Sequence, residues 1–270
     1  FPTRRSSDLA RPGFPLYSRC AARYVRAVPC KPAAKAVVPE NAAMKAAVVT
    51  FPGSNCDRDL AVALKRAGAD VTRVWHKDAE LPAGTDLVAV PGGFSFGDYL
   101  RCGAIAAQSP IAGALRRHAE RGGYVLGICN GFQVLCEAGL LPGALTRNAG
   151  LHFICRDTWL EVASNTSAWT TRYEQGADIL VPLKSGEGRY VASKEVLDEL
   201  EGEGRVVFRY PENLNGSMRD IAGITNEAGN VVGLMPHPEH AVEAGFGPDG
   251  SGVDGQGFFS SAVRTLVSTR

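Results

Sequence analysis

From residue 44 onward, short apolar runs alternate with longer stretches of helical period. Short runs rich in apolar residues are typical of strands, and they predict strands at residues 46–50, 71–75, 86–90 and 124–128. Amphipathic stretches predict helices at residues 57–67, at 132–138, and within 104–121 with a start at Pro110. This alternation predicts an α/β fold: a mostly parallel, doubly wound sheet with helices on both faces.

The pattern changes between residues 151 and 210, where strand-like runs follow one another without long helices. This change predicts a small antiparallel extension of the sheet. Its expected elements, together with those that close the chain, are strands at residues 158–162, 179–182, 206–210, 221–225 and 231–235 and helices at 196–203 and 258–267.

One cysteine lies at a predicted corner between a strand and a helix. Cys129 follows the apolar run 124–128, has Gly127 and Gly131 two residues away on either side, and precedes a helical stretch that ends at Gly139. This is the nucleophile-elbow arrangement, with sulfur in place of the serine oxygen. The helix N-terminus behind the sulfur favours the thiolate form.

A cysteine nucleophile needs a base, and the chain has five histidines. His237 lies between Pro236 and Pro238 directly after an apolar run, and Glu239 follows two residues later. Residues two apart in an extended segment face the same way, so Glu239 is expected to orient the imidazole of His237. Cys129, His237 and Glu239 therefore form a candidate acyl-transfer triad of nucleophile, base and orienting acid.

A tetrahedral intermediate also needs backbone donors for its oxyanion. The amide of Asn130, directly after the cysteine, is one candidate. The second is expected from the Gly92–Gly93 turn that ends the strand at 86–90, with Gly93 preferred. Each motif taken singly has a non-catalytic interpretation: a core cysteine, a loop histidine or a common glycine turn. Their combination is what indicates catalysis specifically.

Three segments together resemble a known family. Residues 91–104 (PGGFSFGDYLRCGA), 127–133 (GICNGFQ) and 236–239 (PHPE) are similar to the triad-type, class I glutamine amidotransferases. Within that group they most resemble the glutaminase subunits of phosphoribosylformylglycinamidine synthase, and the resemblance runs from Met44 to the C-terminus. It implies a flavodoxin-like sheet of the class I amidotransferase type.

The resemblance also implies a reaction. Cys129 would attack the side-chain amide of L-glutamine to form a thioester, and His237, oriented by Glu239, would protonate the leaving ammonia and then activate water. Gln133 would lie near the glutamine pocket. The ammonia would pass to a separate synthetase subunit, accompanied by a small accessory subunit, which uses ATP and Mg²⁺ to convert formylglycinamide ribonucleotide to its amidine in purine biosynthesis. No cofactor or nucleotide site is expected in this chain.

One position departs from the family pattern, because Ser185, preceded by Lys184, stands where a histidine is expected before Gly-Glu-Gly.

Two alternatives to the glutaminase function are open. Other thiol hydrolases of the same superfamily usually place a histidine directly after the nucleophile, where this chain has Asn130. A non-catalytic regulatory subunit would not need an intact triad.

Charge divides the chain unevenly. Residues 1–43 hold eight basic and two acidic residues, whereas residues 44–270 carry a net charge of −5. Residues 1–43 have three interpretations: a transit-type targeting segment, a basic disordered leader, or translated upstream sequence before a start at Met44, which we prefer. We interpret residues 44–270 as the amidotransferase domain. An acidic domain argues against a nucleic-acid partner.

The cysteines and the hydropathy of the chain bear on disulfides, metal sites and cellular location. Seven cysteines without regular spacing argue against a disulfide framework, and the lack of a Cys-x-x-Cys pair gives no zinc signature. Cys56, in a further family-like segment at residues 51–57 (FPGSNCD), and Cys102 could line the pocket, but small buried fillers are the simpler interpretation. No metal site, no membrane span and a cytoplasmic location are expected.

Overall fold

The structure is a computed structural model that describes residues 44–245, 250 and 252–268. The predicted leader at residues 1–43 lies outside the described residues, so its interpretation stays a prediction. In the described part, no helix is both long and apolar enough to cross a membrane.

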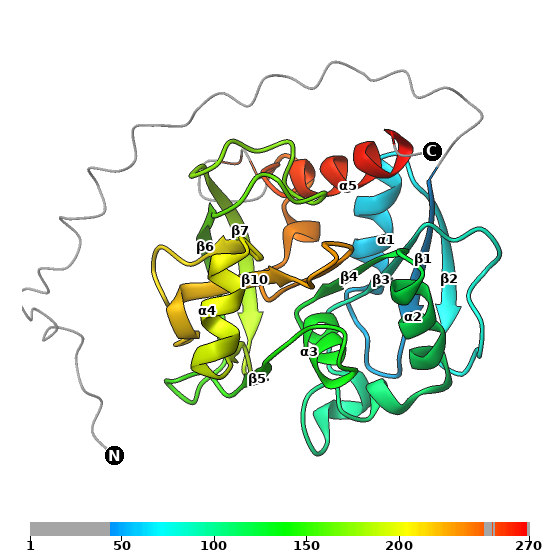
Figure 1. Cartoon of the computed structure of the whole chain (residues 1–270), viewed down its shortest axis with the longest axis horizontal. Coiled ribbons are helices and arrows are strands. Elements are labelled where there is room, and N and C mark those ends of the chain that lie inside the picture. Colours follow the sequence, from blue (N-terminus) through cyan, green and yellow to red (C-terminus); the bar gives the residue numbers. More distant parts are fainter. Residues whose placement is uncertain (1–43, 246–249, 251, 269–270) are drawn as a thin grey trace, which may run out of the picture. The chain divides into compact units, whose positions relative to one another are not determined.

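Nine strands of the described chain form one sheet, and five neighbouring strands of it run parallel in the order β2-β1-β3-β4-β11 (Figure 1). These strands are β1 (Lys45–Thr50), β2 (Asp70–Trp75), β3 (Leu87–Val90), β4 (Tyr124–Ile128) and β11 (Val231–Leu234). Every residue of β3 and β11 is buried, because helices cover both faces of a parallel sheet. Burial on both faces explains why these strands appear in the sequence as continuous apolar runs.

The predicted antiparallel extension is also present, and it completes the sheet in the order β10-β9-β6-β7. Its strands are β6 (Ile154–Val162), β7 (Asp178–Ser185), β9 (Val206–Arg209) and β10 (Ile221–Thr225). Along β7, buried and less buried positions alternate, as in a strand with one face on the core. A separate pair, β5 (Ala144–Thr146) and β8 (Arg189–Val191), was not predicted, since three residues are too few to show a period.

Helices cover both faces of the parallel part, as predicted (Figure 1). On one side lie α1 (Asp57–Arg66) and α5 (Gln256–Ser268), and on the other lie α2 (Pro110–Glu120) and α3 (Asn130–Glu137). Pro110 is the first residue of α2, where its missing amide hydrogen costs no helical hydrogen bond. Helix α3 begins two residues earlier than predicted, directly after Cys129.

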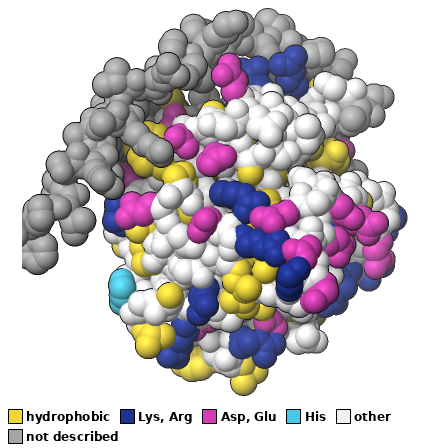
Figure 2. Space-filling model, turned by 60° about the vertical axis from the view of Figure 1, so that its left-hand side comes forward, with side chains coloured by type: hydrophobic (Ala, Val, Ile, Leu, Met, Phe, Trp, Pro, Cys, Tyr) yellow, Lys and Arg dark blue, Asp and Glu magenta, His cyan; other side chains and the backbone are white. Residues whose placement is uncertain are grey.

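The fifth helix, α4 (Lys194–Gly202), belongs to the antiparallel part and carries ion pairs on its surface. Arg219 contacts both Asp198 and Glu201 of this helix, and Arg209 contacts Glu201 at 2.7 Å. The face turned forward in Figure 2 shows basic and acidic side chains next to one another. Such mixing is unlike the single-sign stripe of a nucleic-acid-binding surface.

Helix α3 packs directly on the end of β3, and Gly131 makes this contact possible. A Cβ atom at Gly131 would lie 2.0 Å from the carbonyl oxygen of Val90. Gly202, at the end of α4, has nothing within 4 Å of the same position.

We expect Gly131→Ala to lower the free energy of unfolding by about 1–3 kcal/mol, because α3 must move off the backbone of β3. Gly202→Ala is the matched control and should change stability by less than about 1 kcal/mol, in the stabilising direction. Denaturant unfolding of both variants measures the difference. Equal midpoints for the two variants would contradict this account of the packing.

Candidate active site

Cys129 occupies the corner between β4 and α3 in a backbone conformation that is rare for a side-chain-bearing residue. Its φ is 52° and its ψ is −108°. Two backbone bonds hold the corner: the Cys129 amide donates to Leu234 of β11 (2.8 Å), and its carbonyl accepts from the Gln133 amide (3.2 Å). Strain of this kind persists when the surroundings fix it, and it is typical of functional sites.

His237 and Glu239 are in direct contact, as the sequence predicted. Nδ1 of His237 lies 2.6 Å from Oε1 of Glu239, and the two residues are only 2% and 3% exposed. The reason differs from the prediction, because the segment is not extended: Pro238–His240 forms a short 3-10 helix. The bond from the His237 amide to the carbonyl of Pro182 in β7 (2.8 Å) fixes the start of this turn.

Gly92 lies where the candidate nucleophile and base meet. A Cβ atom at this position would be 2.7 Å from Cε1 of His237, 3.4 Å from Cβ of Cys129 and 3.5 Å from Sγ of Cys56. Any side chain at residue 92 would therefore push the imidazole away. The end of β3, the corner after β4 and the turn after β11 converge at this glycine.

Burial and charge oppose each other at the histidine. Burial alone would lower the pKa of His237, but the charges of Glu239 and Cys129 outweigh it and hold that pKa well above its usual value. Burial would likewise raise the pKa of Glu239, yet the charge and hydrogen bond of His237 keep it below its usual range. The pair therefore favours an imidazolium beside a carboxylate, which is the form of a general acid.

The two preferred oxyanion donors come from different segments, the start of α3 and the turn after β3. Asn130 supplies the first amide of α3, which has no partner within the helix. Gly93 has a φ of 143° and forms an isolated antiparallel bridge with Ser54. A Cβ atom there would lie 2.6 Å from the carbonyl oxygen of Gly53, so the close approach of the two loops requires glycine. The oxyanion role of both residues stays a prediction.

Side-chain amides tie the start of α3 to its surroundings. The Asn130 side chain accepts from the Ser95 amide (3.1 Å) and donates to Oε1 of Gln133 (2.9 Å). Gln133 in turn donates to the carbonyl of Glu187 (2.7 Å) and is only 5% exposed. Gln133 thus holds the residue 185–188 segment against the elbow, and its place near a glutamine pocket stays a prediction.

Lys184 and Ser185, where the sequence departs from the family pattern, lie beside the candidate nucleophile. The carbonyl oxygen of Lys184 is 3.6 Å from Sγ of Cys129. The side-chain Nζ of Lys184 is 3.0 Å from Nε2 of His240. Ser185 is buried, and its hydroxyl has no hydrogen-bond partner among the described residues. The Asn148 side chain donates to the Ser185 carbonyl at 2.8 Å.

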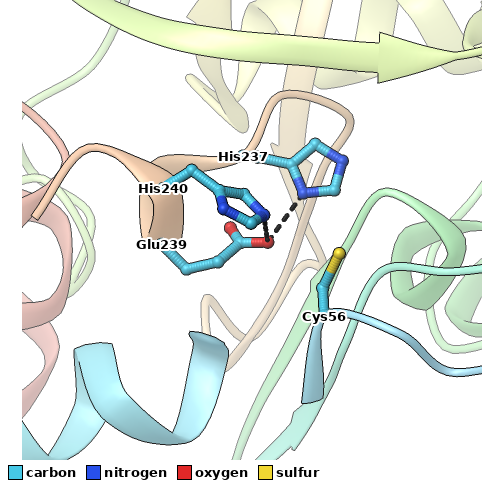
Figure 3. Close-up of side chains that lie close together, drawn as sticks. All are labelled: Cys56, His237, Glu239 and His240. Carbon is cyan, nitrogen blue, oxygen red and sulfur yellow. Dashed lines mark hydrogen bonds and ion pairs between the residues drawn. The ribbon is translucent and has the colours of Figure 1, made fainter. Parts of the chain in front are cut away.

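Sequence reasoning missed His240 and gave Cys56 no definite role. Cys56 was expected either to line the pocket or, more simply, to be a small buried filler; it is buried, and its thiol faces the imidazole of His237 (Figure 3). His240 has its Nε2 3.5 Å from Oε1 of Glu239. The position of His240 three residues after His237 was a signal, but the contact depends on the 3-10 turn. The signal for Cys56 was its place in a family-like segment, but its contact with His237 depends on packing between the start of α1 and the turn after β11.

Comparison with known proteins agrees with this geometry. Residues 43–263 match the CobB/CobQ-like glutamine amidotransferase domain family. The phosphoribosylformylglycinamidine synthase subunit PurQ of Mycobacterium bovis is 65% identical over 221 residues, which cover 82% of this chain and 97% of that protein. The subunit of the same name from Cereibacter sphaeroides is 65% identical over 220 residues, with the same coverage of both chains.

A solved structure supports the same assignment. One chain of PurLQS from Thermotoga maritima is 45% identical with a TM-score of 0.76, and the match covers 83% of this chain and 100% of that one. The resemblance in the sequence motifs is thereby confirmed. Since the family match spans most of its length, the chain belongs to the CobB/CobQ-like glutamine amidotransferase family.

Proposed function

We propose that this chain is the glutaminase subunit of a phosphoribosylformylglycinamidine synthase. It hydrolyses L-glutamine to glutamate and supplies the ammonia for purine biosynthesis. The observation that carries the proposal is the convergence of Cys129 and the His237–Glu239 pair at Gly92, in a chain 65% identical to subunits of that name.

The geometry supports a two-step acyl transfer. Sγ of Cys129 attacks the carboxamide carbon of glutamine, and the amides of Asn130 and Gly93 receive the oxyanion. Collapse of the intermediate breaks the C–N bond, and His237 delivers its proton to the departing ammonia. A thioester remains. His237 then takes a proton from water as the water attacks the thioester, and collapse of the second intermediate breaks the C–S bond, which releases glutamate and restores the Cys129 thiolate beside the protonated His237.

Glu239 serves this cycle through His237 rather than through the substrate. Its carboxylate holds Nδ1 of the imidazole, so that Nε2 is the nitrogen turned to the reaction. In agreement, Nε2 of His237 has no hydrogen-bond partner among the described residues.

The ammonia goes to a separate synthetase subunit, which uses ATP and Mg²⁺ to convert formylglycinamide ribonucleotide to its amidine, and a small accessory subunit completes the complex. Two observations support this division of labour. The relatives are named as subunits of the synthase, and the chain is similar to one chain of the PurLQS structure. We place no nucleotide or cofactor in this chain, and we place the complex in the cytoplasm.

Replacing the nucleophile should separate the two half-reactions. We expect Cys129→Ala to abolish amidine formation from glutamine and leave amidine formation from added ammonia intact, because only acyl transfer is lost. Glutamate release and amidine formation are measured in the complex reconstituted with a synthetase subunit, ATP and substrate. Loss of both activities from a folded variant would refute the division of labour, and glutamate release that persists without the thiol would refute the role of Cys129.

Removing the orienting carboxylate should reduce turnover more than substrate binding. We expect Glu239→Gln to lower the kcat of glutaminase about 10²–10⁴-fold with little change in KM, because the imidazole loses its fixed tautomer and its charge partner. Glu243→Gln is the matched control, since Glu243 pairs with Arg66 at the surface. Equal kcat values for the two variants would show that Glu239 does not orient the base.

A further inference from the structure

Four side chains from two distant parts of the sequence form a compact cluster of metal-binding groups (Figure 3). Cys56 comes from the start of α1, and His237, Glu239 and His240 come from the turn after β11. One donor atom from each residue lies within 4.8 Å of every other. Three of the residues are buried, and the His240 side chain is 20% exposed.

The donor types select a particular class of metal. One thiolate, two imidazoles and one carboxylate suit Zn²⁺ and its softer analogue Cd²⁺, whereas Mg²⁺ and Ca²⁺ prefer oxygen ligands throughout. In a tetrahedral zinc site, neighbouring donor atoms lie roughly 3–4 Å apart. The cluster therefore needs side-chain shifts of about 1 Å to close around an ion.

Two unpartnered polar atoms supply an independent observation. Nε2 of His237 and Oε2 of Glu239 are buried and have no hydrogen-bond partner among the described residues. Buried polar atoms are normally paired, so two unpaired ones in the same cluster are available to a ligand. The backbone of Cys56 is fixed by a 3.2 Å bond from its amide to the carbonyl of Gly92.

We propose that Cys56, His237, Glu239 and His240 bind one thiophilic divalent cation, Zn²⁺ or Cd²⁺, and that this ion inhibits the glutaminase by occupying the imidazole base. The inhibition rests on the proposed function, whereas the binding does not. Binding displaces the thiol proton of Cys56 and the proton on Nε2 of His237, with no redox change, so a chelator should reverse it.

One neighbouring group opposes the cation. The ammonium of Lys184 lies 3.0 Å from Nε2 of His240, the same nitrogen that faces Glu239. An ion that uses this nitrogen must displace the ammonium. Asp59, whose carboxylate is 3.9 Å from Nδ1 of His240, adds negative charge on the other side of the ring.

The test is a Cd²⁺ titration of the full chain, followed by the ultraviolet absorption of the cadmium–thiolate bond and by calorimetry. We expect one ion per chain, loss of the thiolate band in Cys56→Ser, and at least tenfold weaker binding in Cys56→Ser and His240→Ala. Lys184→Met should bind several-fold more tightly. Cys155→Ser and His152→Ala, which remove an exposed cysteine and an exposed histidine, are the matched controls and should bind as the parent does.

Three results would overturn the site. The first is no saturable binding in the parent chain, and the second is a thiolate band that survives in folded Cys56→Ser but disappears in Cys129→Ser. The third is unchanged affinity in His240→Ala. Thermal unfolding of each variant establishes that it is folded, and the two variants, Cys56→Ser and His240→Ala, test the site separately.

The inhibition is measured in the reconstituted complex, as glutamate release relative to each variant's own activity without metal. We expect Zn²⁺ to inhibit the parent, a chelator to restore it, and Cys56→Ser to need at least tenfold more Zn²⁺. Equal sensitivity of parent and Cys56→Ser would refute inhibition through this site. A complex without glutaminase activity would refute the proposed function and leave the Cd²⁺ titration as an independent result.

Discussion

The parallel register of three neighbouring strands is the constraint on which the candidate site depends. Strand β4 lies between β3 and β11, with Gly127 opposite Val90 and Ile128 opposite Leu234. The carboxyl ends of all three strands therefore reach the same edge of the sheet, where ligands of open α/β sheets bind. The glycine turn, the cysteine corner and the histidine turn each begin within four residues of those ends.

The protonation of His237 depends on this geometry, because the converging segments exclude water from the imidazole. A buried histidine would by itself favour its neutral form, and Glu239 reverses that preference at a distance of 2.6 Å. Gly92 contributes by having no side chain. Backbone shape and charge are thus separate requirements of the same site.

Local patterns in the sequence predicted most of the fold and the three triad candidates. Fully buried strands appear as continuous apolar runs, and the start of α2 at Pro110 follows from the proline ring itself. Where a feature depended on long-range packing, local patterns did not predict it. Cys56 is 181 residues from His237 in sequence, and no periodicity relates the two. The turn at Pro238–His240 was expected to be extended, and its 3-10 form brings His240 to Glu239.

Strand β7 is the last strand of the nine-stranded sheet in the described residues, and its outer edge is turned toward the catalytic segments. Leu180, Pro182 and Lys184 direct backbone groups to that edge, where they meet Asp254, His237 and Cys129 respectively. An uncovered strand edge is a template for pairing with other chains. The segments that carry the chemistry therefore also shield the sheet against intermolecular strand addition, so a change that loosens the histidine turn would promote aggregation as well as impair catalysis.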